Sequence, residues 1–112
     1  MELTTRENNG VLVLEPVDRR IDAHAAPSFK TQLLARIDAG SRRVLLNLSN
    51  VAFVDSSGLG VIVSALKHLG REGELKVCAP QAAVRSMFEL TRLHRVIGIF
   101  DTEAEGLESF AA

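Results

Sequence analysis

Six consecutive residues near the middle of the chain combine a carboxylate, two hydroxyls and two glycines: Asp55-Ser56-Ser57-Gly58-Leu59-Gly60. An apolar run precedes them and a helical pattern follows them, so they are predicted to form the exposed start of a helix. Backbone N–H groups lack partners at such a position. Three kinds of chemistry fit these residue types: nucleophilic attack by a serine, binding of a phosphate-bearing ligand, and acceptance of a phosphoryl group by a serine.

Nucleophilic catalysis is the least favoured of the three. A serine nucleophile needs a base within hydrogen-bond reach. Ser56 does not lie in the G-x-S-x-G pattern, because position 54 is valine. His68 lies about three turns along the same helix, too far to reach Ser56 at ~1.5 Å per residue. His24 stays open as a base, since the sequence does not fix its position in space. We therefore do not expect an enzyme.

Binding of a nucleotide or a metal is also disfavoured. The start of a helix attracts anions, but the segment lacks the G-x-x-x-x-G-K-[ST] spacing and its lysine. Asp55 would repel a bound phosphate. Asp22, Asp55, His24 and His94 show no ligand spacing for a metal. We expect neither a cofactor nor a metal.

A structural role for the segment is the simplest interpretation. Either Asp55 or Ser56 can act as the N-cap, accepting a hydrogen bond from a backbone N–H two or three residues on. A cap does not explain Gly58 and Gly60, which each cost ~1 kcal/mol against alanine inside a helix. Glycines leave the backbone bare, so that another surface can approach. From the residues alone, a cap and a cap combined with a contact surface remain equally open.

The strands that must position this segment follow from the apolar pattern. They are predicted over residues 3–6, 11–15, 44–48, 75–79 and 96–100. Asn8-Asn9-Gly10 favours a tight antiparallel hairpin between the first two, because Asn and Gly tolerate positive φ. Val44–Leu48 is the strongest candidate for the centre of the sheet, and residues 49–54 are expected to be a short loop or extension.

Helices are predicted between the strands from residue 25 onward. They begin at residues 25–27, near Leu59, at Pro80 and after Thr102, which has capping-box spacing to Glu105. The apolar residues expected to face the sheet are Ala26, Phe29, Leu33, Leu34 and Ile37; Leu59, Ile62, Val63, Leu66 and Leu69; Ala83, Val84, Met87, Phe88 and Leu90; and Leu107 and Phe110. This alternation predicts an α/β fold with a parallel or mixed sheet. The serine segment then lies at the carboxyl end of a central strand, where such sheets usually place functional sites.

Composition limits the remaining possibilities. The 112 residues suit one domain, and a net charge of −1 lacks the basic excess typical of nucleic-acid binding. The single cysteine excludes an internal disulfide. We find no apolar run approaching ~18 residues and no signal region, so we expect no membrane insertion and a cytoplasmic location.

The segment Asp55–Gly60, preceded by Val44–Leu48, resembles the signature of the STAS-domain anti-sigma factor antagonists. Ile21-Asp22 is similar to the family's Leu-Asp before its first helix, and Val84–Val96 resembles the third helix and following turn. The resemblance covers nearly the whole chain and implies a single STAS domain over residues 1–112. Its implied fold is α/β, with a mixed β-sheet of four to five strands and helices packed largely on one face.

The resemblance also implies a function called partner switching. The unmodified protein would bind an anti-sigma factor that is also a serine kinase, freeing the sigma factor. Phosphorylation of Ser56, with Ser57 as the alternative, would end binding, and a PP2C-type phosphatase would restore it. Asp22 matches the family's acidic residue near the phosphosite. The expected partner-binding residues are Asp22, Asp55, Ser56, Ser57, Gly58, Leu59 and Gly60. A monomer or weak dimer is expected.

Two residues depart from the family pattern. Arg20 and Arg92 stand where family members commonly have glycine, which puts partner identity in doubt more than mechanism. Other roles remain open at this point: a STAS regulatory subunit of a transport system, a module of a non-transcriptional signalling pathway, or a small-ligand or nucleotide sensor.

Overall fold

The first two strands form a hairpin in the computed structural model, which describes residues 1–111. Strand β1 (Leu3–Asn8) pairs antiparallel with β2 (Val11–Pro16). Asn9 and Gly10 connect them with φ of 50° and 81°, the positive values that a tight hairpin turn requires. The predicted hairpin is confirmed, and β1 runs two residues further than expected.

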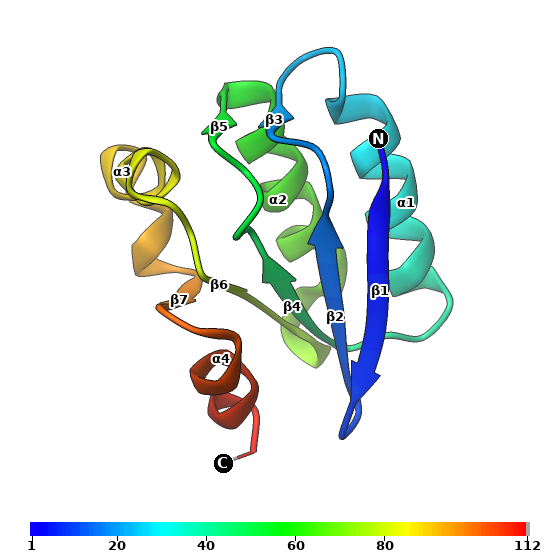
Figure 1. Cartoon of the computed structure of the whole chain (residues 1–112). Coiled ribbons are helices and arrows are strands. Elements are labelled where there is room, and N and C mark those ends of the chain that lie inside the picture. Colours follow the sequence, from blue (N-terminus) through cyan, green and yellow to red (C-terminus); the bar gives the residue numbers. More distant parts are fainter. Residues whose placement is uncertain (112) are drawn as a thin grey trace.

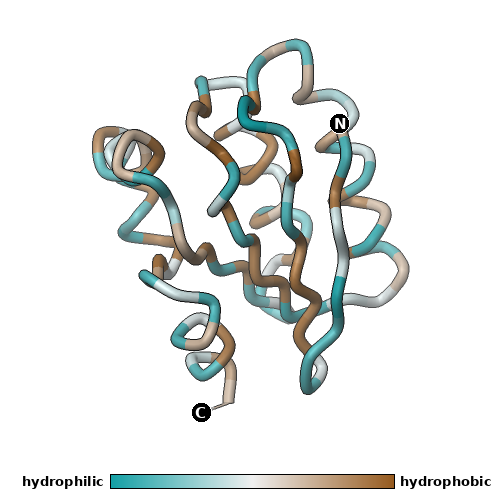
Figure 2. The backbone as a smooth tube through the Cα atoms, in the orientation of Figure 1, coloured by the Kyte–Doolittle hydropathy of each residue, from teal (hydrophilic) through white to brown (hydrophobic). Residues whose placement is uncertain are grey.

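Strand β4 (Arg43–Asn47) lies at the centre of a mixed five-stranded sheet of order β1-β2-β4-β6-β7. It pairs in parallel with β2 and with β6 (Glu74–Cys78), which in turn pairs in parallel with β7 (Gly98–Phe100). Figure 2 shows the apolar character concentrated in these inner strands and a hydrophilic hairpin tip. The predicted central strand is confirmed.

Three helices and one shorter helix cover the two faces of the sheet. Helices α1 (Ala26–Asp38), α2 (Ser56–Leu69) and α3 (Ala82–Leu90) contribute to one core, with α1 and α2 side by side behind the sheet in Figure 1. Helix α4 (Glu103–Ser109) lies on the opposite face. The small core beneath it consists of Val11, Val13, Leu45, Cys78 and Phe110. Helices therefore pack largely on one face, as predicted.

No helix within residues 1–111 has the length and apolarity needed to cross a membrane. Two short 3₁₀ helices, η1 (Gly70–Glu72) and η2 (Leu93–Arg95), follow α2 and α3. Thr102 caps α4 by accepting a hydrogen bond from the Glu105 N–H at 3.1 Å, so the predicted helix start is confirmed.

Two of the predicted helix faces need correction. In α2, Val61 and Ala65 are buried, whereas Val63 is only half-buried. This helix packs against both α1 and the sheet, so its buried face is wider than one stripe. In α3, Ala83 is exposed and Leu90 is 79% exposed.

Helix α3 needs only a narrow buried face. Val84 and Phe88, four residues apart, are fully buried, and Met87 is half-buried. Residues four apart lie above one another on a helix. The helix contacts β5 at the margin of the fold rather than the middle of the sheet, so the rest of its apolar side chains remain outside.

A second, two-stranded sheet was not predicted. Strand β3 (Arg20–Ile21) pairs in parallel with β5 (Phe53–Val54), inside segments that we expected to be connections. Two-residue strands carry no periodicity, which is why the sequence does not reveal them. This small sheet joins the segment before α1 to the segment before α2.

Arg92 adopts a left-handed backbone conformation, with φ 62° and ψ 17°, directly after α3. Side chains other than glycine disfavour this region. Arg92 therefore adopts this conformation at an energetic cost that a glycine would avoid.

A polar contact joins β1 to α4. Arg6 Nη1 and Nη2 donate to the two carboxylate oxygens of Glu103 at 2.9 and 2.6 Å. The buried Asn47 side chain donates to the same carboxylate at 3.0 Å. The Arg6 hydrogen bonds are the main reason that the pKa of Glu103 lies below its usual value.

Candidate functional site

Asp55 is the N-cap of α2. Its backbone is extended, with φ −100° and ψ −174°, and its Oδ1 accepts hydrogen bonds from the N–H groups of Ser57 at 2.9 Å and Gly58 at 3.1 Å. The helix begins at Ser56, three residues before the predicted Leu59. The sequence left Asp55 and Ser56 as alternative caps, and the structure assigns the role to Asp55.

The small sheet holds this cap in place. The Asp55 N–H donates to the Ile21 carbonyl at 3.2 Å, and the Ala52 N–H donates to the Arg19 carbonyl at 2.7 Å. Asp22 follows Ile21 directly. The β3–β5 pair thus brings Asp22 and the Asp55–Gly60 segment to the same end of the fold.

The two glycines of the segment have different surroundings. Gly58 is buried, and a Cβ there would lie 2.7 Å from the Ile21 carbonyl oxygen and 2.9 Å from Val54 Cγ1. Gly60 is exposed, and a Cβ there would meet nothing within 4 Å. The expectation of a bare backbone therefore fits Gly60, whereas internal packing accounts for Gly58. Leu59 is also buried, at 4% exposure.

The two serines line different grooves. Ser56 is exposed and lines a groove of about 460 Å³ between β5 and α3. The other residues lining this groove are Ala52, Phe53, Val54, Asp55, Ala83 and Met87. Ser57 is half-buried and lines a separate groove between α1 and α2, beside Pro27 and Lys30. A partner that approaches through one groove would therefore reach one serine more directly than the other.

Asp22 caps the turn that leads into α1. Its Oδ1 accepts hydrogen bonds from the N–H groups of Ala25 at 3.2 Å and His24 at 3.1 Å. The hydrogen bond from Ala25 is the largest cause of a lowered pKa for this carboxyl, and the positive charge of Arg20 adds to it. Asp22 is therefore ionised at neutral pH, and much of its hydrogen-bonding capacity serves the turn.

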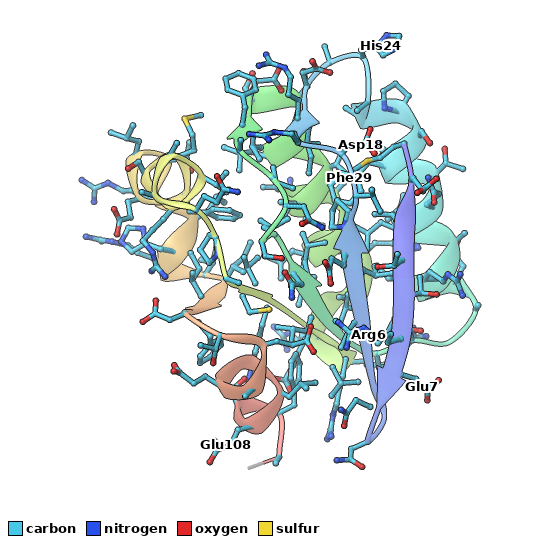
Figure 3. All side chains as sticks on the ribbon, viewed as in Figure 1. Arg6, Glu7, Asp18, His24, Phe29 and Glu108 are labelled. Atoms are coloured by element: carbon cyan, nitrogen blue, oxygen red, sulfur yellow. The ribbon has the colours of Figure 1, made fainter. Side chains whose placement is uncertain are left out.

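The three histidines lie on segments other than the first turn of α2, where Ser56 stands. Figure 3 shows His24 at the outer tip of the loop between β3 and α1, pointing away from the helices. His68 lies in the last turn of α2, with Nε2 2.6 Å from Asp38 Oδ1. His94 lies in η2, with Nδ1 3.4 Å from the Phe88 carbonyl oxygen. His24, which the sequence left open as a base, is thus turned outward.

Sequence reasoning missed one pair of side chains at this site. The Arg20 guanidinium lies 4.3 Å from the centroid of the Phe53 ring, and Phe53 is 40% exposed. Neither residue belongs to the Asp55–Gly60 segment, and their contact depends on the unpredicted β3–β5 pairing. A phenylalanine two residues before a polar helix start was the available signal.

Comparison with known proteins identifies the family. The model of the STAS domain matches residues 2–106. The chain belongs to the STAS family. The sequence-based resemblance and the predicted fold are thereby confirmed.

Individual STAS proteins resemble the chain over nearly its full length. An anti-sigma F factor antagonist from Paenibacillus polymyxa is 28% identical over 109 residues, covering 96% of this chain and 92% of that protein. The crystal structure of an anti-sigma factor antagonist from Mycobacterium paratuberculosis superimposes with a TM-score of 0.92 at 24% identity, covering 99% and 94%. The Bacillus protein SpoIIAA in its phosphorylated form superimposes with a TM-score of 0.74 at 20% identity, covering 97% and 99%.

Proposed function

We propose that this STAS protein is an anti-sigma factor antagonist that acts by partner switching. The unphosphorylated form binds an anti-sigma factor that is also a serine kinase, and this binding frees the sigma factor. The kinase transfers a phosphoryl group from ATP to Ser56 Oγ, releasing ADP and a proton, and the complex dissociates. A PP2C-type phosphatase hydrolyses the phosphoserine and restores binding. The names of the relatives favour this output over a transport subunit or a ligand sensor.

The observation that carries the proposal is the position of Ser56. It is an exposed serine in the first turn of α2, beside a cap that Asp55 already provides. Its hydroxyl is therefore not needed to satisfy the helix start. Ser57 is half-buried, which makes its hydroxyl the weaker acceptor candidate. A structural neighbour is known in a phosphorylated form.

Electrostatics explain how such a modification could switch binding without unfolding the protein. Phosphorylation adds about −1.5 to −2 charges. A negative group at a helix N-terminus gains ~0.3–1 kcal/mol from the helix dipole, so the fold should tolerate it. At a protein interface, an unpaired charge costs several kcal/mol. A thousandfold loss of affinity requires only ~4 kcal/mol.

The deciding experiment measures binding of the anti-sigma factor kinase from the same genome to wild type, Ser56→Ala and Ser56→Asp, with Ser57→Ala as the matched control. We expect wild type, Ser56→Ala and Ser57→Ala to bind, and ATP to release wild type and Ser57→Ala only. Ser56→Asp should bind at least a hundredfold more weakly. Mass spectrometry after kinase treatment should find the phosphate on Ser56. Equal binding by all variants, or a phosphate on neither serine, contradicts the proposal.

A further inference from the structure

Strand β1 forms an open edge of the five-stranded sheet. Among the strands within residues 1–111 it pairs only with β2, and Figure 1 shows it as the outermost strand. Five of its six residues are exposed. Proteins usually protect such an edge with a proline, a bulge or a covering element. Strand β1 contains no proline and pairs with β2 residue by residue, without a bulge, so its edge is regular along its whole length.

The hydrogen bonds of the hairpin show which backbone groups of β1 are left over. Hydrogen-bonded and non-hydrogen-bonded residue pairs alternate along two antiparallel strands. The Val17 N–H donates to the Glu2 carbonyl at 3.0 Å, immediately before β1 begins. In the register that follows, Leu3, Thr5 and Glu7 fall in non-hydrogen-bonded pairs with β2. Their N–H and C=O groups therefore point outward, away from the sheet.

The side chains of β1 leave this row of outward groups accessible. Successive side chains of a strand point to opposite faces of the sheet. Arg6 points to the face that carries α4, where it binds Glu103. Leu3, Thr5 and Glu7 point to the other face, where Leu3 packs against the main core and the other two are exposed. None of these side chains extends along the plane of the sheet across the edge.

We propose that β1 pairs antiparallel with β1 of a second copy of this chain, about a two-fold axis at Thr5. The two sheets then join into one, and the interface is the same surface on both copies. Thr5 lies opposite the partner's Thr5, and Leu3 lies opposite the partner's Glu7. The Thr5 pair forms two backbone hydrogen bonds, and each of the two pairs of Leu3 with Glu7 forms two more. This pairing uses every outward backbone group of β1.

The edge is complementary to itself in this register. Arg6 lies opposite the partner's Thr4, so no charged side chain faces a like charge, which would disfavour the pair. An axis at Arg6 would oppose two guanidinium groups, and an axis at Glu7 would oppose two carboxylates. An axis at Leu3 or Thr4 would leave Glu7 without a strand to pair with.

The backbone of Met1 explains that last limit. Its carbonyl accepts a hydrogen bond from the Gln32 side chain of α1 at 2.8 Å, so Met1 does not extend the open edge. The axis at Thr5 is therefore the register that joins all three outward residues without opposing like charges. This match of the edge to its own reverse favours a second copy over another protein as the occupant.

The interface leaves the serine segment free. The residues that line the groove beside Ser56 come from β5, α2, α3 and the residue before β5, and none comes from β1. A dimer would thus present two serine segments. The proposal does not depend on partner switching, because it concerns a different surface.

Sedimentation equilibrium over a concentration series tests the dimer. We expect wild type to pass from monomer to dimer as its concentration rises. Thr5→Pro removes an outward N–H that β2 does not use, and edge strands tolerate proline, so this variant should dimerise at least tenfold more weakly. Thr5→Val keeps the N–H and should stay within about twofold of wild type. A monomer at every concentration, or a Thr5→Pro dimer as tight as wild type, overturns the proposal.

A charge exchange tests the position of the axis and does not depend on proline being tolerated. Thr5→Lys and Thr5→Glu each place two like charges opposite each other, so each variant alone should dimerise at least tenfold more weakly. An equimolar mixture of the two should recover the dimer, because opposite charges then face each other. Thr91→Lys and Thr91→Glu, at an exposed threonine after α3, are the matched controls and should dimerise like wild type. No recovery in the mixture contradicts an axis at Thr5.

Amide hydrogen exchange measured by NMR tests the register residue by residue. The N–H groups of Leu3, Thr5 and Glu7 should exchange more slowly as the concentration rises from micromolar to millimolar, because only the second copy binds them. The Arg6 N–H points toward β2 and should be protected at every concentration. A dimer that forms without slowing exchange at the three outward residues would use another surface, and the proposal would be wrong.

Discussion

The Asp55–Gly60 segment consists of an inner and an outer part with different tasks. Asp55, Gly58 and Leu59 form the inner part: they cap α2, admit the Ile21 backbone and fill the core. Ser56 and Gly60 form the outer part and are exposed. A motif that looks uniform in sequence is thus subject to one constraint from folding and, under the proposed function, to a second from contact with partners. Variants of the two parts should separate these constraints.

Gly58→Ala should have the largest effect on stability. The new Cβ would stand 2.7 Å from the Ile21 carbonyl oxygen, a backbone atom that cannot move without disturbing β3. Overpacking of this kind costs about 1–3 kcal/mol, and the gain in helix propensity recovers only part of it. Chemical denaturation measures the change. An unchanged free energy of unfolding would show that β3 yields easily and that Gly58 is not part of the inner constraint.

Asp55→Ala should destabilise the protein by about 1 kcal/mol, because two N–H groups lose their acceptor at the start of α2. Asp55→Asn is the matched control, since its amide oxygen can still accept, and it should lose less. Denaturation of the two variants at the same pH gives the difference. If both variants lose the same free energy of unfolding, the carboxylate contributes by its charge and not as a cap.

Gly60→Ala should raise the free energy of unfolding, whereas Gly58→Ala should lower it. The added methyl group meets nothing within 4 Å, and alanine favours a helix over glycine by up to about 1 kcal/mol. We expect a more stable protein that nevertheless binds the kinase more weakly, because the methyl group would stand on the proposed contact surface. A stabilised variant with full affinity would remove Gly60 from the outer part.

Arg92→Gly tests a position where the backbone conformation, and not the surrounding space, favours glycine. Glycine accepts the φ of 62° without penalty, so the variant should gain a few tenths to about 1 kcal/mol of stability. Arg95→Gly in η2, a residue without positive φ, should instead lose stability. Thermal unfolding compares the two. If both variants are less stable than wild type, the Arg92 side chain stabilises the protein by more than its left-handed backbone conformation destabilises it.

The contact between Arg6 and Glu103, on the face of the sheet that carries α4, should make the stability of the protein depend on pH. The pKa of Glu103 is lowered, so its contact with Arg6 stabilises the fold above the ordinary pKa of 4.5, and this contribution is lost as the pH falls through the folded value. Glu103→Gln should therefore show a flatter fall in stability below about pH 4.5 than wild type. Denaturation midpoints along a pH series measure it. Identical slopes would show that the pair does not contribute.

Much of this molecule follows from local sequence. The Asn9-Gly10 turn and the apolar run of β4 were predicted because their signals lie within a few residues. The reason for Gly58 was not, since Ile21 reaches it only through the pairing of two-residue strands. The Arg20–Phe53 stack depends on the same pairing. The exposure of Leu90 was missed because periodicity marks an apolar face but does not tell whether that face meets the core or a partner.

The contact between Arg6 and Glu103 joins residues 97 positions apart. During synthesis on a ribosome, β1 would leave the exit tunnel long before its partner on α4 is made. Until then Arg6 lacks this carboxylate, and the small core of Val11, Val13 and Leu45 has no Phe110 to cover it. Contacts between distant positions also form slowly, because a long loop must close first. The protein would therefore complete its α1–α2 face first and seal the opposite face last.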